Sequence, residues 1–188
     1  MTLNELDEYE QVLASTYAQV FILVKSDTPL GICASQTAEM ISSYLHDATY
    51  FARQNDQVNW LISLGYAHGW LYGAVMLGYM HVSLPPLPRS IVLDTSFSRK
   101  LHEKKERYDK MLSTALASVC IAPSSGSPLW KAAHELHGLV SQDLVKSRTS
   151  SAEDALLLLS YAYGGFDFGV RSGLYQIVSH PHLFTTDM

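Results

Sequence analysis

Apolar residues recur at three- and four-residue steps along the start of the chain, the spacing that places side chains on one face of an α-helix. This stripe predicts a first helix running to about Lys25, formed by Leu3, Leu6, Leu13, Tyr17, Val20 and Val24. The segment from Ser26 to Gly31 contains proline and glycine and is expected to end it. A second stripe predicts a helix from about Ser35 to Gln54, formed by Ile41, Leu45, Ala48 and Ala52. Asp56 then offers an N-cap for a third helix.

The third helical segment is almost wholly apolar, and it raises the question of a membrane span. Residues 60–80 contain no formal charge over about the length that crosses a bilayer. However, Ser63 and His68 interrupt the segment, and no cluster of Lys or Arg flanks it. The corresponding stretch of the second half also contains Asp167 and Arg171. We therefore expect a buried helix and no membrane partner.

The second half of the chain shows three similar segments after a proline-rich stretch at residues 83–95, which cannot continue a helix. Its first helix starts near Ser96 and carries opposite charges three or four residues apart, as expected of a solvated face. The Ser127-Pro128 pair predicts the start of the next helix. The buried stripe of that helix comprises Leu129, Ala133, Leu136, Val140 and Leu144. Residues 150–153 resemble a capping box for a last helix that should run to about Val178.

The two halves also match each other in sequence. Residues 61–78 align with residues 156–173 without gaps at a shift of 95, with seven identities in 18 positions. Residues 9–20 align with residues 108–119 at a shift of 99, with four identities. Because the matches occur in the same order at nearly equal shifts, they favour an internal duplication with a small length change between them.

These patterns predict an all-α protein, a six-helix bundle made of two tandem three-helix units related by a pseudo-two-fold axis. The first unit would span residues 1–82 and the second residues 96–179, joined by the proline-rich linker at 83–95. Residues 180–188 show no periodicity and are expected to form a loose tail.

Composition narrows the class of protein. With 188 residues, 47% of them hydrophobic and 16% charged, the chain has the composition of a folded globule. The net charge of −5 gives no broad positive field, so we expect no nucleic-acid partner. Cys33 and Cys120 cannot form a disulfide framework, and the acidic start lacks the features of a signal peptide. We therefore expect a cytoplasmic location.

Small residues form a stripe along the third helix of each half, at Gly65, Gly69, Gly73, Ser160, Gly164, Gly169 and Gly173. Each glycine inside a helix costs roughly 0.5–1 kcal/mol relative to alanine, so a compensating interaction is expected. The favoured explanation is close packing of the two third helices against each other. The alternative is a ligand or partner that lies on the bare stripe.

Aromatic and titratable residues flank this stripe and define a candidate cleft for a ligand or partner. Its residues are Tyr66, His68, Trp70, Tyr72, Tyr161, Tyr163 and Asp167. The competing interpretation is that the aromatic residues belong to the core, that His68 is hydrogen-bonded in place and that Asp167 pairs with Arg171.

No motif predicts a cofactor or a metal. Residues 134–137 read His-Glu-Leu-His, which lacks the four-residue separation of the histidines in the HExxH zinc motif. The glycines do not follow the GxGxxG or GxxxxGK[ST] spacing, and there is no GxSxG. No pair of carboxylates suggests acid/base chemistry, so we assign no catalytic residue.

The third helix resembles a known family. The Tyr-Ala-x-Gly-Trp-Leu sequence with its spaced glycines, preceded by Asp47-Ala48-Thr49-Tyr50-Phe51 and then Asn55-Asp56, is similar to the archaeal domain of unknown function 357. The resemblance covers about residues 5–80, and residues 161–164 carry a weaker one. It implies a small helical domain and an archaeal source, with no assigned activity. The family's Asp after Trp-Leu corresponds to Tyr72 in the first copy and to Asp167 in the second.

Two functional hypotheses follow. The first is a non-enzymatic interaction or scaffold module that binds a protein or self-associates, which requires an exposed apolar patch. The second is small-ligand binding or catalysis in a cleft between the two copies. It requires a polar-lined pocket of several hundred Å³ and a shifted pKa at His68 or Asp167.

Overall fold

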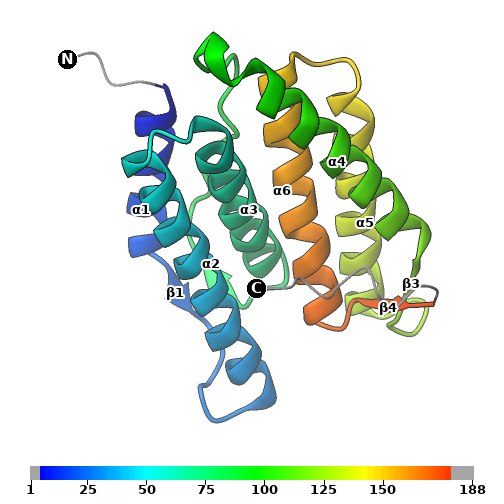
Figure 1. Cartoon of the computed structure of the whole chain (residues 1–188). Coiled ribbons are helices and arrows are strands. Elements are labelled where there is room, and N and C mark those ends of the chain that lie inside the picture. Colours follow the sequence, from blue (N-terminus) through cyan, green and yellow to red (C-terminus); the bar gives the residue numbers. More distant parts are fainter. Residues whose placement is uncertain (1–4, 179–188) are drawn as a thin grey trace.

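The computed structural model describes residues 5–178, and they form a mostly helical protein (Figure 1). This confirms the helical fold class. The helices are α1 (Glu5–Ala18), α2 (Pro29–Arg53), α3 (Gln57–Met76), the short 3₁₀ helix η1 (Thr95–Phe97), α4 (Ser98–Ala117), α5 (Pro128–Ser147) and α6 (Ala152–Arg171). The strands are β1 (Phe21–Ile22), β2 (Met80–His81), β3 (Val119–Ile121) and β4 (Tyr175–Ile177). The expected tail at 180–188 lies outside the described residues.

Polar side chains cap four of the α-helices within the described residues. Asp56 and Ser151 accept hydrogen bonds from the third following backbone N–H, and Ser127 does the same immediately before Pro128. The caps at Asp56 and Ser127 were predicted and are confirmed. The predicted capping box at residues 150–153 was wrong by one residue, because its cap would be Ser150 and the cap in the structure is Ser151. The cap at Thr28 was missed: its Oγ1 accepts from Gly31 N at 3.0 Å, and Pro29 occupies the first turn of α2. Proline and glycine in this segment therefore begin α2, because proline fits the first turn of a helix.

Two helix ends differ from the prediction. The first helix ends at Ala18, well before Lys25, and the last ends at Arg171 instead of Val178. The residues beyond each end form strands. Hydrophobic spacing did not reveal this, because Val20 and Val24 continue the helical period although they lie outside α1.

Each half closes with a two-stranded antiparallel ribbon, which joins its first loop to the end of its third helix. β1 pairs with β2 and β3 with β4, and Phe21↔His81 in the first ribbon corresponds to Cys120↔Gln176 in the second. Leu23 N donates to Tyr79 O at 2.9 Å in one half, as Ala122 N donates to Leu174 O at 3.0 Å in the other. These equivalences follow the shifts of 99 and 95 found in the sequence.

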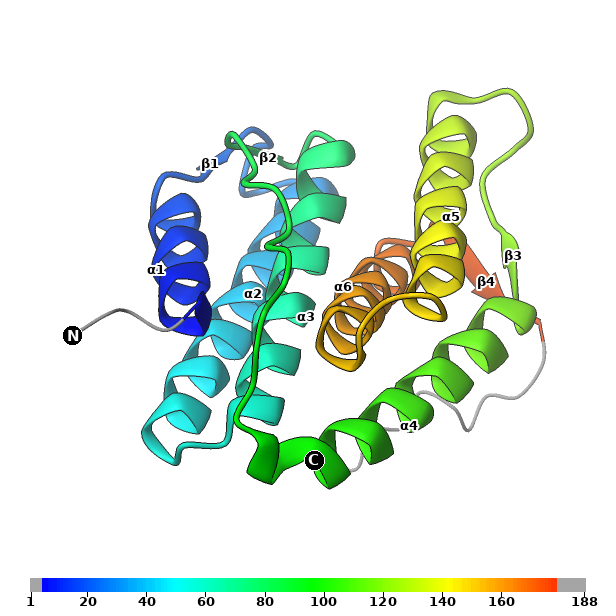
Figure 2. The same ribbon diagram turned by 90° about the horizontal axis from the view of Figure 1, so that it is seen from above.

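The helices pack as two groups of three with α3 and α6 in the middle (Figures 1 and 2). The most extensive contact joins α3 to α6; α1 and α2 pack on α3, while α4 and α5 pack on α6. Nearly every residue of α3 is buried, which explains its continuous apolar sequence. Within residues 5–178, we find no helix that combines the length and apolarity required to cross a membrane.

The proline-rich segment between the halves runs alongside the first half (Figure 2). Its Val92 N donates to Glu5 of α1 at 2.9 Å, and its Asp94 N donates to Gln57 of α3 at 2.8 Å. On the other side, Ser90 N donates to Asp154 of α6 at 3.1 Å. The segment thereby connects both halves.

Candidate functional site

The small-residue stripes of α3 and α6 lie directly against each other. A Cβ added at Gly65 would collide with the Ser160 side chain, and one added at Gly69 would collide with the Tyr161 carbonyl oxygen. The contact is reciprocal, because a Cβ added at Gly164 would collide with the Tyr66 carbonyl oxygen. At Gly65, Gly69 and Gly164, α3 and α6 are therefore too close for a ligand to lie between them.

The remaining glycines of the predicted stripe have other neighbours. A Cβ at Gly73 would meet the ring of Phe168 from α6, and one at Gly169 would meet the ring of Tyr175 from β4. Gly173 follows the C-cap of α6 with φ +75°, and nothing lies within 4 Å of its added Cβ. Gly173 therefore ends α6 in a left-handed conformation and does not pack α3 against α6. Gly78 ends α3 in the same way, with φ +71°.

His68 lies on one side of the α3–α6 contact and is 2% exposed. Its Nδ1 is 3.0 Å from the Tyr9 hydroxyl, and its ring also interacts with the Pro85 backbone. Since a carbonyl can only accept, the ring N–H belongs to the nitrogen that faces Pro85, and Tyr9 donates to Nδ1. Burial lowers the pKa of His68 to about 4, so the ring is neutral at ordinary pH. His68 links α1, α3 and the proline-rich segment.

Tyr161 of α6 contacts both His68 and Tyr72 of α3. The Tyr161 ring packs edge-on against His68 at 5.3 Å and against Tyr72 at 5.9 Å between centroids. The gap that these two tyrosines share with Gly69 and Gly165 measures about 10 Å³, room for one water molecule at most.

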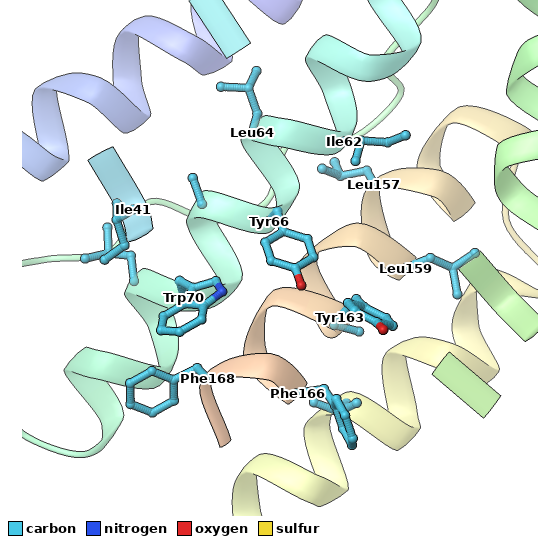
Figure 3. Close-up of a cluster of buried hydrophobic side chains, with 14 of the residues drawn as sticks. Ile41, Ile62, Leu64, Tyr66, Trp70, Leu157, Leu159, Tyr163, Phe166 and Phe168 are labelled. Carbon is cyan, nitrogen blue, oxygen red and sulfur yellow. The ribbon is translucent and has the colours of Figure 1, made fainter. Parts of the chain in front are cut away.

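Tyr66 of α3 and Tyr163 of α6 lie near each other where the two helices meet (Figure 3). The Tyr66 ring lies 5.8 Å from Tyr163 and 4.3 Å from Tyr44 of α2. Burial raises the pKa of Tyr44 and of Tyr163 to about 12, and that of Tyr66 well above its usual value. All three phenols are therefore neutral and form part of the core.

Asp167 acts electrostatically on all three phenols of this cluster. Burial raises the pKa of its carboxyl, whereas Arg171, Tyr66 and Trp70 oppose that rise. Arg171 Nε donates to Asp167 Oδ1 at 3.4 Å, the i, i+4 pairing expected from the sequence. Trp70 is 2% exposed and close to this carboxyl, but its Nε1–H has no well-formed hydrogen bond within the described residues.

A pocket of about 490 Å³ opens next to Trp70, between α2 and the end of α6. Sequence reasoning placed Trp70 and the neighbouring Asp167 in a cleft between the halves, but it missed the other lining residues. These are Cys33, Gln36, Thr37, Glu39, Met40 and Ser43 of α2, with Tyr79, Arg171 and Ser172. The residues on α2 belong to no motif, since only the packing of α2 on α3 and α6 brings them to one place.

Histidines that could suggest a metal have other neighbours. The ring of His134 packs against Trp130 at 4.1 Å, and His137 faces Tyr175 at 6.0 Å. Burial lowers the pKa of His137, with a smaller contribution from nearby His134. No group of three potential ligands among His, Cys, Asp and Glu is close enough to hold a metal within residues 5–178.

The described residues form a mostly helical protein in which α3 and α6 pack on each other through small residues. Residues 8–80 match the family described as "Protein of unknown function (DUF357)". The match supports the resemblance for the first half, and the family description carries no activity. Comparisons with curated proteins and with solved structures found no match.

Proposed function

We propose that the protein is a non-enzymatic helical interaction module that self-associates through one apolar end of its first half. The apolar end consists of β1, the residue after it and the first turn of α2: Phe21, Ile22, Leu23, Leu30 and Ile32. Phe21 is 71% exposed and Leu23 is 60% exposed, so consecutive large apolar side chains face water. This exposed run is the observation that carries the proposal, because such patches are typical of protein interfaces.

The free edge of β1 favours a second copy of the chain as the partner. Leu23 N bonds to Tyr79 O, so the alternation of an antiparallel ladder directs the N–H and C=O of Ile22 away from β2. No other strand within the described residues pairs with that edge. Two β1 strands can pair antiparallel about a two-fold axis at Ile22, the commonest symmetry of homo-oligomers. The pairing would cover an apolar strand edge that otherwise promotes aggregation.

We further infer that the halves are two tandem diverged copies of one unit, residues 1–82 and 96–179, joined by residues 83–95 and related by a pseudo-two-fold axis. The repeated strand pairing and the reciprocal contacts of Gly69 and Gly164 support this inference. Reciprocity is the property of an interface between symmetric subunits. An archaeal source and a cytoplasmic location stay predictions.

The test is the mass of the protein in solution as a function of concentration, measured by light scattering and sedimentation. We expect a monomer–dimer equilibrium, and we expect Leu23→Lys to shift it to the monomer by placing a charge on the strand edge. Val145→Lys is the matched control: Val145 is 62% exposed but lies on α5, in the second half.

A mass that stays monomeric at every concentration would contradict self-association. Equal weakening of the dimer by Leu23→Lys and by Val145→Lys would contradict the assigned surface, since a local interface must distinguish the two positions.

A further inference from the structure

The pocket between α2 and the end of α6 has an apolar floor and a charged rim. Buried or half-buried side chains form the floor: Cys33, Thr37, Met40, Trp70 and Tyr79. The rim is polar and consists of Gln36, Glu39, Ser43, Arg171 and Ser172. A volume of about 490 Å³ lies within the range of pockets that hold small molecules. Both halves contribute to the pocket.

The rim places one charge of each sign on different walls. Glu39 is an exposed carboxylate on α2, whereas Arg171 is an exposed guanidinium at the end of α6. The only hydrogen bond of Arg171 to Asp167 uses Nε, so both Nη groups remain available as a donor fork at the pocket. A carboxylate is the planar acceptor that suits such a fork.

Trp70 forms part of the floor and is 2% exposed. Its indole N–H faces the carboxyl of Asp167, although the bond is not well formed. Because Trp70 interacts with Asp167, and Asp167 binds Arg171, this N–H lies near the donor fork.

We propose that this pocket binds a small zwitterion, an α-amino acid with an apolar side chain. Its carboxylate is held by Arg171, its ammonium group by Glu39, and its side chain lies on Met40, Trp70 and Tyr79. A polyanion such as inorganic phosphate fits less well, because residues 1–82 carry eight acidic and only two basic side chains. This binding is independent of the proposed self-association at β1.

At the equivalent place in the second half, the described residues leave only a small gap, so one site per chain is expected. The position 95 residues after Trp70 is Gly165, which has no indole to form the floor. The nearby gap beside Gly165 measures about 10 Å³. Leu136 and Val140 approach an added Cβ at Gly165 within 3.5 and 3.7 Å and occupy the space.

The experiment is a titration of the ¹⁵N-labelled full chain by NMR, following the indole N–H signals of its three tryptophans. Trp60→Phe and Trp130→Phe assign the signal of Trp70. The probes are L-phenylalanine, phenethylamine, which lacks the carboxylate, and 3-phenylpropionate, which lacks the ammonium group. We expect L-phenylalanine to shift the Trp70 signal saturably at one site per chain, and each analogue to bind about tenfold or more weakly, since each loses a charge-assisted hydrogen bond.

Two substitutions identify the groups. Arg171→Gln should weaken L-phenylalanine binding about tenfold and leave phenethylamine binding unchanged, whereas Glu39→Gln should weaken binding of both amines. The matched control is Arg148→Gln: Arg148 Nε also lies 3.4 Å from a carboxylate, that of Asp109, at nearly the same exposure as Arg171. The proposal is overturned if the Trp70 signal does not respond to L-phenylalanine, if both analogues bind as tightly, or if Arg148→Gln weakens binding as much as Arg171→Gln.

Discussion

The two halves of the molecule share a backbone framework and differ in the chemistry that they present. Both end their third helix with a left-handed glycine, at Gly78 and Gly173, and both pair strands in the same register. Their charges differ: residues 1–82 carry eight acidic and two basic side chains, whereas residues 96–179 carry eight acidic and ten basic ones. Their ribbons differ as well, because Phe21 of β1 is an exposed aromatic residue and its counterpart in β3 is Cys120.

The comparison shows at which positions the fold requires a small residue and at which positions the residue can differ. Small residues occupy the positions where backbone meets backbone in both halves, since a larger side chain there would separate α3 from α6. Positions where side chains meet differ between the halves: Gly165 lies 95 residues after Trp70. The pocket and the apolar end lie where the side chains of the two halves differ, so neither is repeated at the corresponding described residues of the second half.

The largest loss of stability is expected from substitutions at the α3–α6 contact. Gly69→Ala places a methyl group against the Tyr161 carbonyl and 2.8 Å from Gly165 N, so two backbones must separate. We expect a loss of about 3 kcal/mol or more in the free energy of unfolding. Gly164→Ala should lose a similar amount, because the contact is reciprocal. Urea denaturation measures both losses.

A helical glycine in open space supplies the control for that experiment. Nothing lies within 4 Å of a Cβ added at Gly138 of α5, so Gly138→Ala should stabilise the protein by about 0.5–1 kcal/mol through helix propensity. If Gly69→Ala were neutral or stabilising like Gly138→Ala, the close packing of α3 on α6 would be wrong.

A smaller effect on stability is expected from His68, whose counterpart in the second half is Tyr163. The pKa of His68 falls from 6.5 to about 4 in the folded protein, so the unfolded chain binds more protons between these values. Folding is therefore favoured above pH 6.5, and roughly 2–3 kcal/mol is lost as the pH drops toward 4. His68→Gln should remove this dependence and lower stability at neutral pH by leaving Tyr9 or Pro85 unpaired.

The comparison must be made between the wild type and the variant over the same pH range. The carboxyls of Asp143 and Asp167 have a raised pKa through burial, so their folded forms gain protons first as the pH falls, which acts in the opposite direction. Their contribution is common to both proteins and cancels in the difference. A difference that does not vary between pH 6.5 and 4 would contradict the buried, neutral His68.

Helical periodicity predicted the six helices, because each has a face or a whole surface that must be buried. It did not predict the strands, since a ribbon of two or three residues leaves no period and depends on contacts between distant segments, such as Phe21 with His81. At Gly65 and Gly69 of the glycine stripe, a side chain and a carbonyl of α6 approach the backbone of α3.

The candidate site was predictable only in part. Trp70 and Asp167 stand out in the sequence, because an aromatic residue and a charge are unusual beside a glycine stripe. Glu39 and Met40 lie on a helix of ordinary amphipathic pattern, and nothing in their spacing indicates a pocket. The pocket arises where α2 passes the end of α6, and that depends on the tertiary arrangement.

The smallest effect compares the caps at the start of the second helix in each half. Thr28 Oγ1 accepts from Gly31 N at 3.0 Å, and Ser127 Oγ accepts from Trp130 N at 3.1 Å. Alanine at either position should cost about 1 kcal/mol in the free energy of unfolding, because one N–H of the first turn loses its acceptor. Thr28→Ser keeps the oxygen and should cost much less. If Ser127→Ala proves costly while Thr28→Ala is neutral, the start of α2 at Pro29 is wrong and the equivalence of the two halves at this point is lost.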